Sequence, residues 1–125
     1  MRAGDPLPPL EIEVTRTLVV AGAIASRDYQ DVHHDPEAAR RGGAPDIFLN
    51  ILTTNGLVGR YVTDRFGPTA VLRSLALRLG APAHPGDTLR LTGVVEESEG
   101  RRAVVRVSGD NAAGRHVTAT AEVTW

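Results

Sequence analysis

The sequence contains no cysteine, no lysine and no long apolar run. Without cysteine, the chain cannot form disulfides, thiolate metal sites or a cysteine nucleophile. No apolar stretch approaches the roughly 20 residues of a membrane helix. The formal net charge is −1, so the basic excess usual in nucleic-acid-binding domains is absent. These absences favour a cytoplasmic protein with neither a membrane nor a nucleic-acid partner.

The length and composition predict a single domain spanning residues 1–125. A chain of this size buries roughly two-thirds of its unfolded surface, which leaves room for one core and one site. The apolar fraction of 42% is ordinary for a globular protein. The stretch "TLVVAGAIAS" imitates the apolar part of a signal peptide. The segment before it is acidic and proline-containing, however, whereas a signal peptide begins with basic residues.

Hydrophobic periodicity predicts an α+β fold. After an irregular, proline-rich lead-in, residues 11–20 ("EIEVTRTLVV") alternate as a strand does. Residues 46–66 follow helical spacing, with Asp46 as N-cap, and predict a buried central helix. A short helix is predicted after Asp35, with Pro36 in its first position. A curved antiparallel sheet around the central helix accommodates the four further strands, predicted at 69–80, 88–97, 101–109 and 116–125.

Asp28 and His33 are the candidate proton-transfer pair. Five residues apart on a regular helix, they would point about 140° apart, so they need a loop or a broken helix to act together. Histidine exchanges protons near neutral pH, and a neighbouring carboxylate can orient it or share the transfer. The alternative is that Asp28 caps a helix and His33 is a surface loop residue. The start of the predicted central helix follows this segment and could bind a carbonyl oxygen that gains negative charge.

The other polar residues give weaker signals. His34 suggests a metal site with Asp31 or Asp35, but no third ligand lies at a usual spacing, so we predict no metal. The sequence has neither a glycine-rich phosphate loop nor a serine nucleophile elbow. Two histidines are predicted to lie at the surface, His84 and His116.

The segment "RDYQDVHHDPEAA" resembles the hydratase motif of the MaoC-like hotdog family, D-x-N-P-x-H followed by D-P-x-x-A. The resemblance extends along the chain and implies a single hotdog fold that pairs into a double hotdog. The stretches "DIFLNILTTNGLVGRYVTD" and "VTATAEV" are similar to the small MaoC-like subunit of actinobacterial heteromeric steroid enoyl-CoA hydratases. The residues that match the motif are Asp28, His33, Asp35, Pro36 and Ala39.

This resemblance implies an enoyl-CoA hydratase (hydro-lyase) of cholesterol side-chain degradation. Its substrate would be a steroid enoyl-CoA of the 3-oxo-4,17-pregnadiene-20-carboxyl-CoA type, hydrated at the side-chain double bond. Asp28 and His33 would activate the water and protonate the α-carbon, and a backbone N–H, aligned at Asn50, would hold the thioester oxygen. No cofactor is implied, because coenzyme A is part of the substrate.

The sequence departs from the family motif at three places. Gln30-Asp31 replaces Asn-Pro, Leu49-Asn50 replaces His-Gly at the helix start, and Val58 replaces a serine. These departures fit one specialised half of a heteromer. The implied partner is a second, different MaoC-like subunit, in a heterodimer or heterotetramer, with a downstream aldolase bound through that subunit.

Two alternatives remain open from the sequence. One is a non-catalytic hotdog subunit that completes a partner's acyl-CoA pocket. The other is a hotdog thioesterase, which usually has a carboxylate on the central helix, where this sequence offers none before Asp64.

Overall fold

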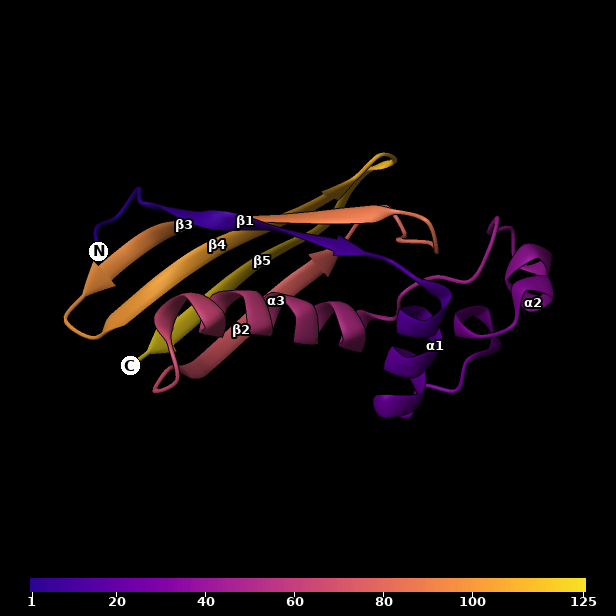
Figure 1. The fold of residues 1–125 in the computed structure, drawn as a ribbon, viewed down its shortest axis with the longest axis horizontal. Coiled ribbons are helices and arrows are strands. Elements are labelled where there is room, and N and C mark those ends of the chain that lie inside the picture. Colours follow the sequence, from indigo (N-terminus) through magenta and orange to yellow (C-terminus); the bar gives the residue numbers. More distant parts are fainter.

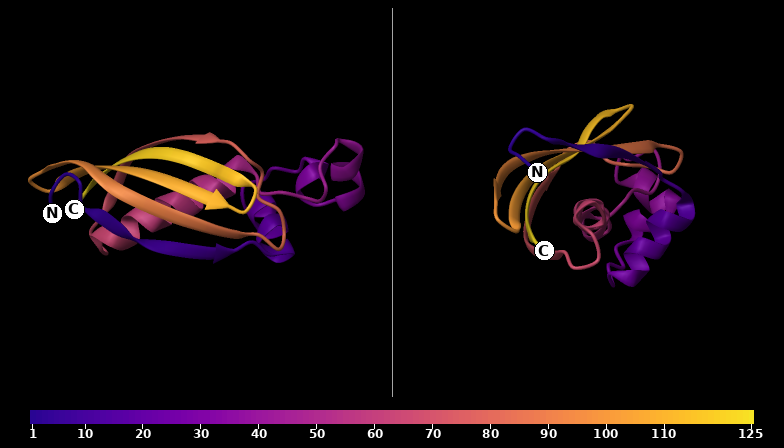
Figure 2. Two further views of the ribbon diagram at one scale, coloured as in Figure 1. Left: turned by 90° about the horizontal axis from the view of Figure 1, so that it is seen from above. Right: turned by 60° about the vertical axis from the view of Figure 1, so that its left-hand side comes forward.

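In the computed structural model, which describes residues 1–125, one antiparallel sheet of five strands curves around a long helix (Figures 1 and 2). The strand order is β1-β3-β4-β5-β2, so β1 and β2 form the two edges. The smaller helices gather at one end of the sheet (Figure 1). In chain order, the elements are β1 (Pro6–Glu13), α1 (Arg16–Ala25), a 3₁₀ turn (Asp31–His33), α2 (Pro36–Arg41), α3 (Ile51–Phe66), β2 (Val71–Leu79), β3 (Thr88–Glu99), β4 (Arg102–Asn111) and β5 (Gly114–Thr124).

The core lies between the concave face of the sheet and α3. Alternating residues of β3, β4 and β5 are buried against this helix, which presents Val58 and Val62 to them. Each fully buried valine stabilises the fold by roughly 1.5–3 kcal/mol. The sheet contributes nine fully buried apolar side chains: Leu89, Leu91, Val95, Ala103, Val105, Val107, Val117, Ala121 and Val123. The predicted arrangement of a curved sheet around one central helix is confirmed.

The proline-rich lead-in is a strand, which corrects the sequence prediction of an irregular segment. Pro6, Pro8 and Pro9 all lie in β1, which pairs only with β3. An edge strand tolerates proline because its outward N–H groups have no ladder partner. The opposite edge, β2, has no buried residue, and Val71 and Leu79 at its ends are 44% and 40% exposed.

The strand predicted at residues 11–20 is confirmed only for residues 11–13, because the chain leaves the sheet after Glu13 and forms α1. Thr15 caps this helix, and its hydroxyl accepts a hydrogen bond from the Leu18 N–H at 3.0 Å. Val19 and Ala23, four residues apart, are buried on one side of α1. A short apolar run fits both periods, and here the helical period decides which residues are buried.

The central helix begins at Ile51 rather than at residue 46. Its N-cap is Asn50, whose side-chain oxygen accepts a hydrogen bond from the Thr53 N–H at 3.1 Å. Asp46 caps no helix and instead forms two hydrogen bonds with Arg16, at 2.6 and 3.1 Å.

The remaining predicted elements are present. Asp35 caps α2 by accepting from the N–H groups of Glu37 and Ala38, and Pro36 takes the first helical position. All four predicted C-terminal strands form, with ends shifted by up to two residues. None of the helices has the length and apolarity that a bilayer span requires.

Candidate active site

Asp28 and His33 face each other at the end of the molecule that carries the small helices. Asp28 Oδ2 lies 3.4 Å from His33 Nε2. The His33 side chain is 7% exposed and the Asp28 side chain 24% exposed, so solvent reaches the pair mainly from the carboxylate side. The alternative of a surface histidine is therefore wrong, and the two residues form the pair that the sequence suggested.

The irregular segment between α1 and α2 brings Asp28 and His33 together. The Asp28 N–H donates to the Ala23 carbonyl at 2.9 Å, which ties this residue to the last turn of α1. Arg27 adopts a left-handed conformation with φ 57°, and the chain turns sharply there. The 3₁₀ turn at Asp31–His33 then directs the imidazole back toward the carboxylate.

A backbone carbonyl fixes the tautomer of the neutral His33 ring. Its Nδ1 lies 2.8 Å from the Phe48 oxygen, and a carbonyl can only accept, so Nδ1 carries the hydrogen. In the neutral ring, Nε2 therefore presents a lone pair toward Asp28. The Phe48 ring packs edge-on against the imidazole, with 5.1 Å between centroids and 81° between planes.

Asn50 connects the start of α3 to Asp28. Its amide Nδ2 donates to Asp28 Oδ2 at 3.2 Å and to the Ser26 hydroxyl at 2.8 Å. The bond from Asn50 is the largest influence on Asp28, whose carboxyl pKa lies below its ordinary value. Burial opposes this lowering of the pKa, and the Gln30 N–H and the charge of His33 add to it. The carboxylate is thus held ionised beside the imidazole.

The first turn of α3 offers free backbone donors next to this pair. The Leu49 N–H donates to the Ala83 carbonyl, and the Thr53 N–H donates to the Asn50 side chain. Between them, the N–H groups of Asn50, Ile51 and Leu52 have no partner in the chain, as expected for a helix N-terminus. Such donors can stabilise an oxygen that gains negative charge.

Two histidines that the sequence analysis predicted at the surface form hydrogen bonds to loop backbone near α3. His116 is 1% exposed, and its Nδ1–H donates to the Ala81 carbonyl while its Nε2 accepts from the Thr54 hydroxyl. Burial lowers the pKa of His116, so the ring is neutral. His84 is half-buried and its Nδ1–H donates to the Ile47 carbonyl. The assignment of His116 to the surface was wrong, because alternation along the sequence does not reveal a loop folding over it, whereas His84 keeps part of its surface exposed.

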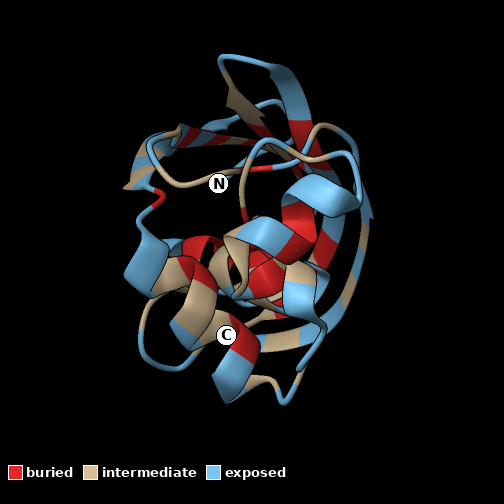
Figure 3. Ribbon diagram, turned by 90° about the vertical axis from the view of Figure 1, so that its right-hand side faces the viewer, coloured by how far each residue is buried: buried red, intermediate tan, exposed pale blue.

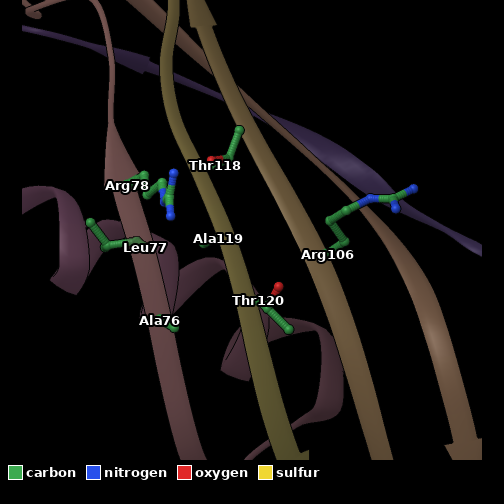
Figure 4. Close-up of a pocket in the computed structure, with 7 residues that line it drawn as sticks. All are labelled: Ala76, Leu77, Arg78, Arg106, Thr118, Ala119 and Thr120. Carbon is green, nitrogen blue, oxygen red and sulfur yellow. The ribbon is translucent and has the colours of Figure 1, made fainter.

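No other part of the chain gathers comparable chemistry. His34 is exposed, and the structure contains no group of three or more potential metal-ligating side chains. A hollow on the outer face of the sheet, away from α3, is lined by residues of β2, β4 and β5 (Figure 4). It holds Arg78 and Arg106 but no acid–base pair, and Arg106 is bound to Glu96 at 3.1 Å.

The hollows of this chain do not enclose the pair. None of the hollows in the surface of the chain includes Asp28 or His33. Figure 3 looks onto this end of the molecule, where exposed segments of the small helices surround the buried core. The large exposed apolar side chains at this end come from α1, the following loop and the start of α3: Ile24, Tyr29, Ile51 and Leu52.

A hotdog sheet around a helix whose N-terminus meets an Asp–His pair defines a domain of the hydratase and dehydratase class. The family model described as "MaoC like domain" matches residues 2–116. The chain therefore belongs to the MaoC-like family, and the resemblance found in the sequence is confirmed.

Individual relatives narrow the comparison. The chain is 48% identical over 120 residues to the 3-oxo-4,17-pregnadiene-20-carboxyl-CoA hydratase beta subunit of Mycobacterium tuberculosis (strain ATCC 25618 / H37Rv), covering 96% of this chain and 93% of that protein. The crystal structure of the ChsH1-ChsH2 complex from Mycobacterium tuberculosis matches with a TM-score of 0.95 and 47% identity, over 98% of this chain and 96% of that chain. R-Hydratase PhaJ1 from Pseudomonas aeruginosa matches with a TM-score of 0.88 and 21% identity, over 99% of this chain and 81% of that one. This last likeness shows the fold alone.

Proposed function

We propose that the chain is the small subunit of a heteromeric enoyl-CoA hydratase that adds water to the side-chain double bond of a steroid enoyl-CoA in side-chain degradation. The observation that carries the proposal is the pairing of Asp28 with His33 at 3.4 Å, beside the free N-terminus of α3. The substrate, of the 3-oxo-4,17-pregnadiene-20-carboxyl-CoA type, is inferred from the relative that is 48% identical.

The geometry suggests how the dyad would activate water. Asp28 Oδ2 and the lone pair of neutral His33 Nε2 both accept hydrogen bonds, so a water molecule that lies beside both atoms can donate to both. As the water oxygen bonds to the β-carbon of the substrate, one O–H bond breaks and the dyad takes the proton. The dyad then delivers a proton to the α-carbon, forming the new C–H bond. Because the two groups act as a coupled pair, the individual steps belong to the pair.

The start of α3 would stabilise the enolate that forms between these steps. Negative charge develops on the thioester oxygen, and the backbone N–H of Asn50 is our candidate donor for it. Every group in this scheme comes from the protein or the substrate, and coenzyme A enters as part of the substrate. The scheme therefore needs no separate cofactor.

A second chain is needed to enclose the substrate. Binding sites usually bury most of a ligand's surface in a concavity, whereas the hollows of this chain do not include the dyad. The exposed apolar side chains of Ile24, Tyr29, Ile51 and Leu52 suit a bulky apolar acyl group and a covering subunit. We propose a second, different MaoC-like chain as that subunit. The two chains would form a heterodimer, and two heterodimers would associate into a heterotetramer. An aldolase that catalyses a downstream reaction would bind through the partner subunit. The solved structure that is 47% identical to this chain is itself a complex, of ChsH1 and ChsH2.

The two alternative functions have less support. A thioesterase would use a carboxylate on the central helix, and the first one on α3 is Asp64, near its far end and bound to the exposed Arg60. A purely pocket-completing subunit would have no need for an ionised carboxylate aligned on a histidine of defined tautomer.

We place the reaction in the cytoplasm, which agrees with the absence of cysteine.

The proposal is tested by measuring size and activity together. The chain is purified alone and with a co-expressed candidate MaoC-like partner, and both samples are run on a sizing column and assayed with the steroid enoyl-CoA. We expect a weakly stable, nearly inactive protein alone and a stable, active complex with the partner. A fully active homodimer would contradict the heteromeric assembly, and inactivity of every stable complex would contradict the hydratase function.

A further inference from the structure

The side chain of Asn50 has two separable tasks at the start of α3. Its oxygen accepts hydrogen bonds from the N–H and the hydroxyl of Thr53 and so caps the helix. Because the backbone N–H of Thr53 can only donate, the amide oxygen must face the helix and the nitrogen must face the dyad. The nitrogen donates to Ser26 and Asp28. Asn50 is 1% exposed, so its own polar atoms are shielded from water.

The Asp28 carboxylate has few other constraints. Its Oδ1 accepts from the Gln30 N–H at 3.3 Å, within the same turn. Its Oδ2, the oxygen that faces His33, has one side-chain hydrogen-bond donor, the Asn50 amide at 3.2 Å. Rotation of the carboxyl group about its last bond is broad in energy, so its orientation depends on such partners.

We propose that the Asn50 side-chain amide is a positioning residue that fixes the orientation and the ionised state of Asp28, in addition to capping α3. The inference rests on the proposed function for its catalytic consequence. Without this donor, Oδ2 loses its fixed direction toward the imidazole and the carboxyl group accepts a proton more readily. The start of α3 thus positions both the candidate oxyanion donor, the Asn50 N–H, and the Asp28 carboxylate.

Substitutions at position 50 separate the two tasks. Asn50→Ser and Asn50→Asp both keep an oxygen that can cap the helix, but neither keeps the amide donor. Asn50→Asp also brings a second carboxylate to Asp28, and two adjacent carboxylates do not readily ionise together. Thr53→Ala is the matched control, because it removes the hydroxyl that donates to the Asn50 amide oxygen and leaves the bond from Asn50 to Asp28 intact.

The experiment measures kcat and KM of the complex with the partner subunit as a function of pH. For Asn50→Ser we expect kcat to fall about 10-fold or more through misorientation, with a smaller change in KM. The acid limb of the pH profile should move to higher pH, further for Asn50→Asp than for Asn50→Ser, while Thr53→Ala keeps the wild-type limb. An Asn50→Ser complex with wild-type kcat and a wild-type acid limb would overturn the proposal.

A readout independent of turnover keeps this test distinct from that of the proposed function. The carboxyl ¹³C resonance of Asp28 is followed by NMR titration in the same complexes, with Asp28→Asn used for its assignment. We expect Asp28 to titrate at higher pH in Asn50→Ser and Asn50→Asp than in the wild type. Identical titrations would refute the role of Asn50 even if the enzyme is active, and a shifted titration would support it even if the steroid substrate is wrong.

Discussion

Replacement of Gly22 by alanine tests whether close contact between α1 and α3 supports the site. A Cβ atom at position 22 would lie 2.1 Å from Thr53 Oγ1 and 2.8 Å from Thr53 Cγ2. The Thr53 side chain is β-branched, which restricts its rotation, and its hydroxyl is bonded to Asn50. The clash therefore pushes the two helices apart. Because Ser26 and Asp28 directly follow α1, hydratase activity should fall together with stability.

The magnitude follows from two opposing effects. Overpacking usually costs about 1–3 kcal/mol, and a contact this short favours the upper value. Alanine gains up to about 1 kcal/mol over glycine inside a helix. The net loss is then about 2 kcal/mol, which corresponds to a fall of about 8 °C in Tm at about 4 °C per kcal/mol.

The same substitution at Gly56 is the control. This glycine lies on the exposed side of α3, and a Cβ there would meet no atom within 4 Å. Gly56→Ala should therefore raise stability by about 0.5–1 kcal/mol. In thermal unfolding monitored by circular dichroism, we expect Tm to be highest for Gly56→Ala, intermediate for the wild type and lowest for Gly22→Ala. Adding Thr53→Ala to Gly22→Ala should recover part of the loss, and a Gly22→Ala protein as stable as the wild type would refute the reasoning.

Three further predictions concern the buried histidine and the substrate. Thr54→Val leaves His116 Nε2 buried without a donor, so the free energy of unfolding should fall by about 1–3 kcal/mol in urea denaturation, and an unchanged midpoint would contradict this. Burial lowers the pKa of His116 from its ordinary value of 6.5, so the unfolded chain takes up the proton first. The contribution of His116 to stability is complete above pH 6.5 and declines as the pH falls below that value. When the pH is lowered from about 7.5 to about 5.5, the Tm of His116→Gln should therefore fall less than the Tm of the wild type. Turnover of the complex should be faster on the steroid enoyl-CoA than on crotonyl-CoA or a straight medium-chain enoyl-CoA, and a preference for the straight chains would indicate a fatty-acid hydratase instead.

The sequence predicted the parts of the fold that follow a long, regular period. The central helix and the four C-terminal strands each repeat their apolar pattern over two or more turns or several alternations, so their type was right. The segment after Glu13 is a helix because Thr15 caps it and because Val19 and Ala23 face the core. Neither fact is visible in a short apolar run. In β5, His116 and Val117 are both buried, since the loop at Ala81 covers the strand end and interrupts the alternation.

The candidate site was predictable only in part. Asp28 and His33 were identified from the family motif, because their spacing alone favours a helix cap and a surface loop residue. The carbonyl of Phe48 that fixes the tautomer of His33 is a backbone group, which leaves no trace in the sequence. Asn50 was predicted for its backbone N–H, whereas its side-chain bond to Asp28 depends on how closely α1 approaches α3.

The most direct test of the account is the hydration rate of the Asp28→Asn complex. The chain is co-expressed with its MaoC-like partner, and loss of the conjugated enoyl thioester is followed for the wild type, Asp28→Asn and Asp64→Asn. Asp64 is an exposed carboxylate near the other end of α3 and serves as the matched control. We predict that Asp28→Asn slows hydration by about 10²–10⁴-fold, while the complex stays assembled and Asp64→Asn keeps the wild-type rate. A folded, assembled Asp28→Asn complex that hydrates the substrate at the wild-type rate would contradict the account.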